Sequence, residues 1–158
     1  MNASQSETPQ QILERLGLAL PPVDDDPHYT NARESAGGQI FISGQLPYRD
    51  GVLPMSGRVG AEVSVDEARD LMLQATLNGL AVAAHATGGL DRVRMIQMLA
   101  FVNAVDGFEQ QSRVADAGSN LLTDVLGDDG RHARTAIGVA SLPRNSAVEV
   151  QFICEARR

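Results

Sequence analysis

One segment, VRMIQMLAFVNAV at residues 93–105, limits most strongly the folds open to this chain. Both of its alternating sets of residues are mostly apolar: one set is Val93, Met95, Leu99 and Phe101, and the other is Ile96, Met98, Ala100 and Val102. A strand with this pattern is covered on both faces. The fold must therefore place a packed layer on each side of a sheet at this segment.

Two segments have the pattern of core helices. The sequence Ser64-Val65-Asp66-Glu67 is a capping box, and the apolar spacing after it predicts a helix to about residue 86, before Gly88-Gly89. A second helix is predicted over 110–126, with Gly127 ending it. A shorter helix after Thr8-Pro9, followed by the connector PPVDDDP, precedes the first strand.

The remaining apolar runs predict strands. One hairpin is expected over 32–42 around the turn Gly37-Gly38, and a second at the C-terminus, with strands at 134–140 and 147–155. The order ββαβαββ gives an α+β fold in which two helices cover one face of a single mixed sheet. No helix remains for the other face, so we expect it to pack against copies of the same chain.

Composition excludes several classes of function. The 158 residues form one domain of ordinary composition, and the net charge of -7, with 4% aromatic residues and no Trp, argues against a nucleic-acid partner. No apolar run reaches the roughly 20 residues that span a membrane. The polar start, without a secretory pattern, and the single Cys154 predict a reducing, cytoplasmic location.

Few side chains could carry chemistry. His28, His85 and His132 are far apart in sequence, so no metal site is predicted, and Cys154 alternates with apolar residues as a buried structural thiol would. Arg134 opens a strand of small and apolar residues, and Glu149 interrupts another. A guanidinium beside a buried sheet requires an anionic partner. That partner is either a substrate carboxylate or an internal acid.

Several motifs resemble the reactive intermediate deaminase family, RidA/YjgF: SGQLP at 43–47, LDRV at 90–93, FVNA at 101–104, GRHARTAIGVASLP at 130–143 and AVEVQF at 147–152. The match covers about residues 29–156. Residues 1–28 then form an extra N-terminal helix and connector of a distinct branch, and residues 29–158 form the RidA/YjgF-like domain.

The resemblance implies a chorismate-mutase-like fold and a homotrimer in which three sheets pack together, with active sites in the clefts between subunits. It also implies cofactor-free, metal-free hydrolysis of enamines and imines of the 2-aminoacrylate type to a 2-keto acid and ammonia. Arg134 matches the family's carboxylate-binding arginine, and Glu149 the acid that positions water. Tyr29, Ser43 and Gly44 match residues that line the cleft.

The chain departs from the family pattern at three places. A cleft asparagine has no counterpart around residues 112–116, a family cysteine is Ala136, and an acid of the last strand is Gln151. These departures bear on the substrate range. Two alternative functions stay open beside imine hydrolysis. One is endoribonuclease activity, and the other is a non-catalytic trimer that binds small carboxylates.

Overall fold

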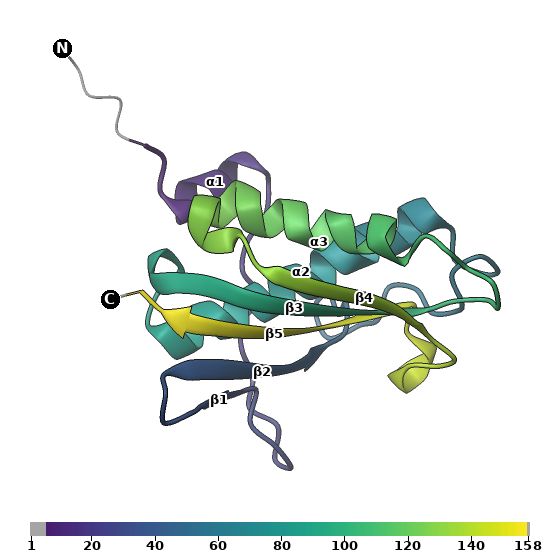
Figure 1. Ribbon diagram of the computed structural model, residues 1–158, viewed down its shortest axis with the longest axis horizontal. Coiled ribbons are helices and arrows are strands. Elements are labelled where there is room, and N and C mark those ends of the chain that lie inside the picture. The colour runs from purple at the N-terminus through teal and green to yellow at the C-terminus, as the bar shows by residue number, and fades with distance from the viewer. Residues whose placement is uncertain (1–5, 158) are drawn as a thin grey trace.

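The computed structural model describes residues 6–157 and contains five strands and three α-helices in that range (Figure 1). The helices are α1 Pro9–Arg15, α2 Val65–Thr87 and α3 Gln111–Leu126. The strands are β1 Ala32–Glu34, β2 Gln39–Gln45, β3 Val93–Asn103, β4 Ala133–Val139 and β5 Val148–Ala156. Short 3-10 turns lie at η1 Leu90–Arg92, η2 Gly127–Gly130 and η3 Pro143–Asn145.

The helix boundaries follow local signals in the sequence. Thr8 and Ser64 are the N-caps of α1 and α2, and each forms the reciprocal side-chain bonds of a capping box. Gly88 ends α2 with φ 83°, a left-handed conformation that favours glycine. The two core helices and the N-terminal helix are therefore as expected. None of the helices in residues 6–157 is long and apolar enough to cross a membrane.

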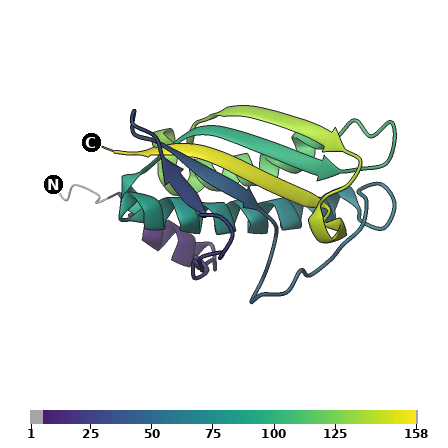
Figure 2. The same ribbon diagram turned by 90° about the horizontal axis from the view of Figure 1, so that it is seen from below.

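The strands form one mixed sheet in the order β1-β2-β5-β3-β4. β3 and β4 are parallel, and the other neighbours are antiparallel. Seen from below in Figure 2, α2 and α3 lie together on one face of this sheet, with α1 packed on the helix layer. The predicted fold class, one mixed sheet with two helices on one face, is confirmed.

The C-terminal hairpin that we expected does not form. β3 lies between β4 and β5 and pairs with both of them. Helix α3 carries the chain from β3 to a parallel β4, and the segment around η3 then crosses the end of β3 to start β5. This order gives the most apolar strand two neighbours, so its backbone groups are hydrogen-bonded on both sides.

A β-bulge in β3 changes which residues face the helices. Met95 pairs with Cys154 and Gln97 with Ile153, so Ile96 is an extra residue. Before the bulge Val93 and Met95 face the helices, and after it Met98, Ala100 and Val102 do. The expected assignment of Leu99 and Phe101 to the same side as Val93 is therefore wrong, because the bulge shifts the alternation by one residue.

The opposite face of the sheet carries apolar side chains that no helix covers. Phe41 on β2 is 42% exposed and Ile137 on β4 is 44% exposed, and Phe101 lies half-buried in the same row as Ile137. We call this side, marked by Phe41, Phe101 and Ile137, the open face. Apolar residues at such a density on a sheet face are typical of an interaction surface.

Cys154 lies on the helix-covered face of β5 and is fully buried. Burial raises the pKa of its thiol to about 12, and the neighbouring Glu155 carboxylate adds to the shift. We expect Cys154→Ala to lower the free energy of unfolding by about 1 kcal/mol through a small cavity, without altering the rest of the fold. Urea unfolding of the two proteins measures this. Rapid alkylation of the native thiol by iodoacetamide would contradict the inert, structural role.

Candidate active site on two faces of the sheet

A second β-bulge, in β2, brings three of the expected site residues together. Ile42 pairs with Phe152 and Gln45 with Val150, so Ser43 and Gly44 together oppose the single residue between them on β5. That residue is Gln151, and Glu149 lies two positions away from it on the same face. The bulge therefore places Ser43 and Gly44 beside the Glu149 side chain.

The Glu149 carboxyl occupies space that only glycine leaves free. A Cβ added to Gly44 would lie 2.0 Å from Glu149 Oε1, so any other residue there would displace the carboxyl. Glu149 is half-buried and has no hydrogen-bond or ion-pair partner within residues 6–157. Burial raises its pKa above the ordinary value of a glutamate. The group can therefore hold a proton closer to neutral pH than a surface glutamate can.

This contact makes Gly44→Ala a sharp test of Glu149's position. We expect the substitution to push the carboxyl out of the bulge and to lower any activity that depends on Glu149 by tenfold or more, because active sites tolerate little misplacement. Gly37→Ala, in the turn of the same hairpin, is the matched control, since its Cβ would meet nothing closer than Ser35 Oγ at 3.8 Å. Equal activity of the two variants would show that Glu149 needs no fixed position.

Ser43 and Tyr29 lie at the same end of the hairpin. The backbone N–H and the hydroxyl of Ser43 both donate to the carbonyl of Asn31, at 2.9 and 3.3 Å. Tyr29 precedes Asn31 by two residues and is 56% exposed. Its ring is therefore available at the surface. Ser43, Gly44 and Glu149 thus come together on β2 and β5, and Tyr29 lies in the segment that leads into β1.

Arg134 lies elsewhere, on the helix-covered face of the edge strand β4. Its Nη1 donates to Asp116 Oδ1 at 2.8 Å and to Ser119 Oγ at 3.1 Å, both on α3. The internal acid that the sequence left open as a partner is therefore present. Nε and Nη2 of Arg134 have no partner among the residues that the structure describes. Two parallel donors on one edge of the guanidinium remain free for a carboxylate.

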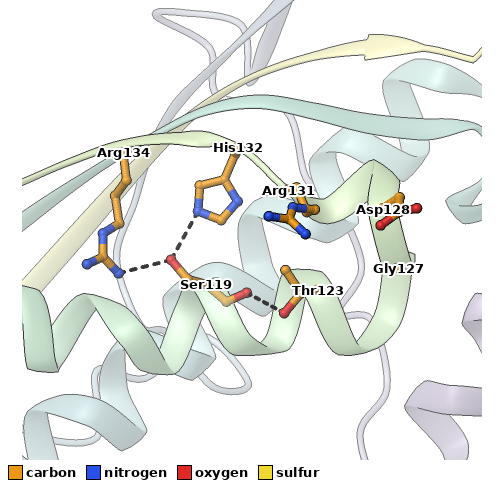
Figure 3. A pocket seen from close by; sticks show the side chains of 7 residues that line it. All are labelled: Ser119, Thr123, Gly127, Asp128, Arg131, His132 and Arg134. Carbon is orange, nitrogen blue, oxygen red and sulfur yellow. Dashed lines mark hydrogen bonds between the residues drawn. The ribbon is translucent and has the colours of Figure 1, made fainter.

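A hydrogen-bonded network next to Arg134 was not predicted from the sequence. Ser119 Oγ lies 3.0 Å from His132 Nε2, and His132 Nδ1 lies 2.6 Å from the carbonyl of Gly130. Figure 3 shows the side chain of Arg134 on β4 and that of His132, just before this strand, extending toward Ser119 on α3. These groups border an open hollow of about 530 Å³ whose lining residues are Ser119, Thr123, Gly127, Asp128, Arg131, His132 and Arg134.

One chain does not bring Arg134 and Glu149 together. Glu149 is level with Phe101 on β3, whereas Arg134 is level with Met98, three residues away along that strand. With two strand spacings between them, their Cα atoms lie about 14 Å apart. Their side chains also leave opposite faces, because Met98 is buried under the helices and Glu149 is on the open face. A small substrate cannot touch both groups of the same chain.

The described part of the chain holds no group of three or more His, Cys, Asp or Glu side chains that could bind a metal ion. The acids Asp24, Asp25 and Asp26 of the connector are adjacent in sequence and belong to no such group. Consecutive carboxylates of this kind are usually solvated individually. The candidate chemistry therefore rests on Arg134, Glu149 and the groups around them.

Comparisons with known proteins agree on the family of this chain. Residues 11–156 match the family described as "YjgF/chorismate mutase-like, putative endoribonuclease". Protein TCP17 of Trypanosoma cruzi is 39% identical over 145 residues, which are 90% of this chain and 91% of that protein.

Two solved structures have the same fold over nearly their whole length. Atu1372 of Agrobacterium tumefaciens, a protein of unknown function, is 36% identical with a TM-score of 0.86, covering 96% of this chain and 93% of that one. A structure from Shewanella oneidensis, called a putative endoribonuclease, is 31% identical with a TM-score of 0.88, covering 94% and 99%. The chain belongs to the YjgF/RidA family.

Proposed function

We propose that this protein hydrolyses reactive enamines and imines of the 2-aminoacrylate type to a 2-keto acid and ammonia. In this reaction the enamine first tautomerises to the imine. Water then adds to the imine carbon, and ammonia leaves as the carbonyl forms. An imine is already electrophilic, so the protein has only to orient it, supply a water molecule and move protons.

The observation that carries this proposal is the free edge of Arg134. Asp116 and Ser119 hold Nη1 and fix the plane of the guanidinium, while Nε and Nη2 point away from these contacts without a partner in residues 6–157. A substrate carboxylate would accept two parallel hydrogen bonds from this edge. Such a contact orients a small imino acid as well as binding it.

Glu149 supplies the proton handling. Its carboxyl lies in the space that Gly44 leaves free at the β2 bulge, and desolvation raises its pKa. A carboxyl with a raised pKa can orient the attacking water and carry a proton to the departing ammonia at pH values near neutrality. Ser43 and Tyr29 would border the substrate beside it.

The site would be completed by a second copy of the chain. Arg134 and Glu149 of one chain lie on opposite faces of the sheet, so a shared substrate requires Arg134 from one copy and Glu149 from the next. The uncovered apolar residues of the open face are suited to such an association. We therefore propose a homotrimer with its sites at the contacts between subunits.

Charge placed on the open face should break this assembly. Ile137→Asp or Phe41→Asp would bury a carboxylate in an apolar interface, which costs several kcal/mol per subunit contact. We expect a folded monomer by light scattering at micromolar concentration and loss of imine hydrolysis. Val52→Asp, also at an exposed apolar residue but in the loop after β2, is the control. A clean monomer mass for the unmodified protein would contradict the proposal.

The experiment that tests the function is a panel of imines generated in place from amino acids by an oxidase, with ammonia release followed over time. Faster release in the presence of the protein supports imine hydrolysis. If the protein binds 2-ketobutyrate but does not accelerate release, it is a carboxylate-binding module instead.

An RNA-cleavage assay titrated with salt tests for endoribonuclease activity, which is the activity named for the Shewanella protein. The net charge of -7 argues against this activity.

A further inference from the structure

The Ser119–His132 contact has the geometry of a nucleophile and its base. Ser119 Oγ and His132 Nε2 are 3.0 Å apart, within the range found for activated hydroxyl groups. The other ring nitrogen, Nδ1, lies 2.6 Å from the carbonyl of Gly130, which therefore orients the ring. A serine, a histidine and a third group that fixes the histidine are the three components that such a site needs.

The direction of each hydrogen bond follows from the groups themselves. The Gly130 carbonyl can only accept, so His132 Nδ1 carries the hydrogen, and the neutral ring presents a lone pair at Nε2. Ser119 can then donate its single hydroxyl hydrogen to Nε2 at 3.0 Å, which is nearer than its other acceptor, Met98 Sδ at 3.6 Å. Arg134 Nη1 donates to the same Ser119 oxygen at 3.1 Å. The serine oxygen thus faces a base on one side and a cationic donor on the other.

The pair is open to small molecules. Ser119, His132 and Arg134 all border the hollow of about 530 Å³ between α3 and the start of β4. Thr123 lies in the same lining, but its hydroxyl is engaged with the carbonyls of Ser119 and Asn120. Ser119 is therefore the hydroxyl of this lining that is paired with a base.

We propose that Ser119 and His132 form a second catalytic site, which hydrolyses short-chain carboxylic esters. Ser119 Oγ attacks the ester carbonyl carbon while its proton passes to His132 Nε2. The carbon–oxygen bond to the alcohol then breaks, and the alcohol leaves with that proton. Water attacks the acyl-serine with His132 again as the base, releasing the carboxylic acid and restoring the serine. The Arg134 donor beside Oγ stabilises the negative oxygen of the intermediate.

The substrate class follows from the hollow. Its lining residues are polar or charged apart from Gly127, none of them has an apolar side chain, and the hollow is open to solvent, so it offers no side chains to hold a long acyl chain. This site also differs from the one proposed for imines, which uses the free Nε–Nη2 edge of Arg134 and Glu149 on the other face of the sheet. Both sites use Arg134, so the two activities are separated by substitutions at His132 and at Glu149, each of which belongs to one site alone.

The test uses the full-length protein with a fluorophosphonate probe and with p-nitrophenyl acetate. A nucleophilic serine attacks phosphorus and expels fluoride, which leaves a covalent mark that peptide mass spectrometry assigns. We expect the mark on Ser119, none at that position in Ser119→Ala, and at least a 100-fold slower reaction in His132→Asn. Asparagine can still donate to the Gly130 carbonyl, so this variant keeps the local turn.

Ser112→Ala, at an exposed serine in the first turn of the same helix, is the matched control and should react like the unmodified protein. No mark on Ser119, or a rate that does not depend on His132, would overturn the proposal and leave the network as a tie between α3 and β4. Imine hydrolysis by Glu149→Gln, assayed in parallel, reports on the other site alone.

Discussion

Arg134→Ala is expected to lower kcat/KM for the proposed imine hydrolysis by roughly 10- to 150-fold while the proposed trimer stays folded. The substitution removes charge-assisted hydrogen bonds to the substrate carboxylate, which are worth about 1.5–3 kcal/mol. Arg134→Lys should recover only part of the loss, because an ammonium lacks two parallel donors. Steady-state kinetics, light scattering and melting temperature on the same preparations measure all three quantities.

The ion pair with Asp116 shows what to expect if Arg134 has only a structural role. Asp116 is half exposed, so its pair with Arg134 contributes at most about 1 kcal/mol to stability. If Arg134 were only structural, Arg134→Ala would lower the melting temperature by a few degrees and leave activity per folded trimer unchanged. Arg92→Ala, at an exposed arginine of η1, removes the same charge elsewhere and controls for a general electrostatic effect. Full activity in folded Arg134→Ala would refute the carboxylate role.

The elements that could be predicted are those with local signals. Ser64 and Glu67 close a capping box within four residues of chain, and Gly88 provides the left-handed end of the same helix. Both depend on neighbours in sequence, so a single sequence suffices to place α2. The hairpin of β1 and β2 around Gly37-Gly38 is local in the same sense.

Strand order and register could not be predicted, because they depend on contacts between distant segments. β3 lies between β4 and β5 in the sheet, but the residues of the turn that joins β4 to β5 do not indicate this order. The bulge at Ile96 is visible only once β5 is paired with β3, and it reverses which residues of β3 face the helices afterwards. The alternation of apolar residues therefore shows which side chains share a face only along a stretch of strand without a bulge.

In the candidate site, too, local features could be predicted and contacts between distant segments could not. Glu149 stood out as an acid within an apolar strand, whereas its role and the choice of Gly44 came from the family resemblance. The close approach of the Glu149 carboxyl to Gly44 arises from pairing between β2 and β5, which the sequence does not show. Asp116 and Ser119 were missed, although their spacing of three residues places both on one face of α3. That spacing becomes meaningful only when β4 is known to place Arg134 opposite them.

Glu149→Gln is expected to have two effects of opposite sign, one on activity and one on stability. The amide cannot accept or release a proton, so kcat for imine hydrolysis should fall by about 100-fold or more. Yet the substitution should increase the free energy of unfolding at pH values above the ordinary pKa of glutamate. Folding raises the pKa of Glu149 by desolvation, so the folded protein binds this proton more tightly than the unfolded chain does.

The sign of the pH dependence follows from this difference. Between the unfolded and the folded pKa the native state carries more protons, so the free energy of unfolding decreases as the pH rises through that interval. Glutamine mimics the protonated form and does not lose this stability. The advantage of Glu149→Gln in urea unfolding should thus be absent at pH values below the ordinary glutamate pKa, increase as the pH rises, and level off above the raised pKa. Glu34→Gln, at an exposed glutamate of β1, should show no such trend. A stability difference that does not change with pH would show that Glu149 is not held in a desolvated position, and the proton-carrying role would fail with it.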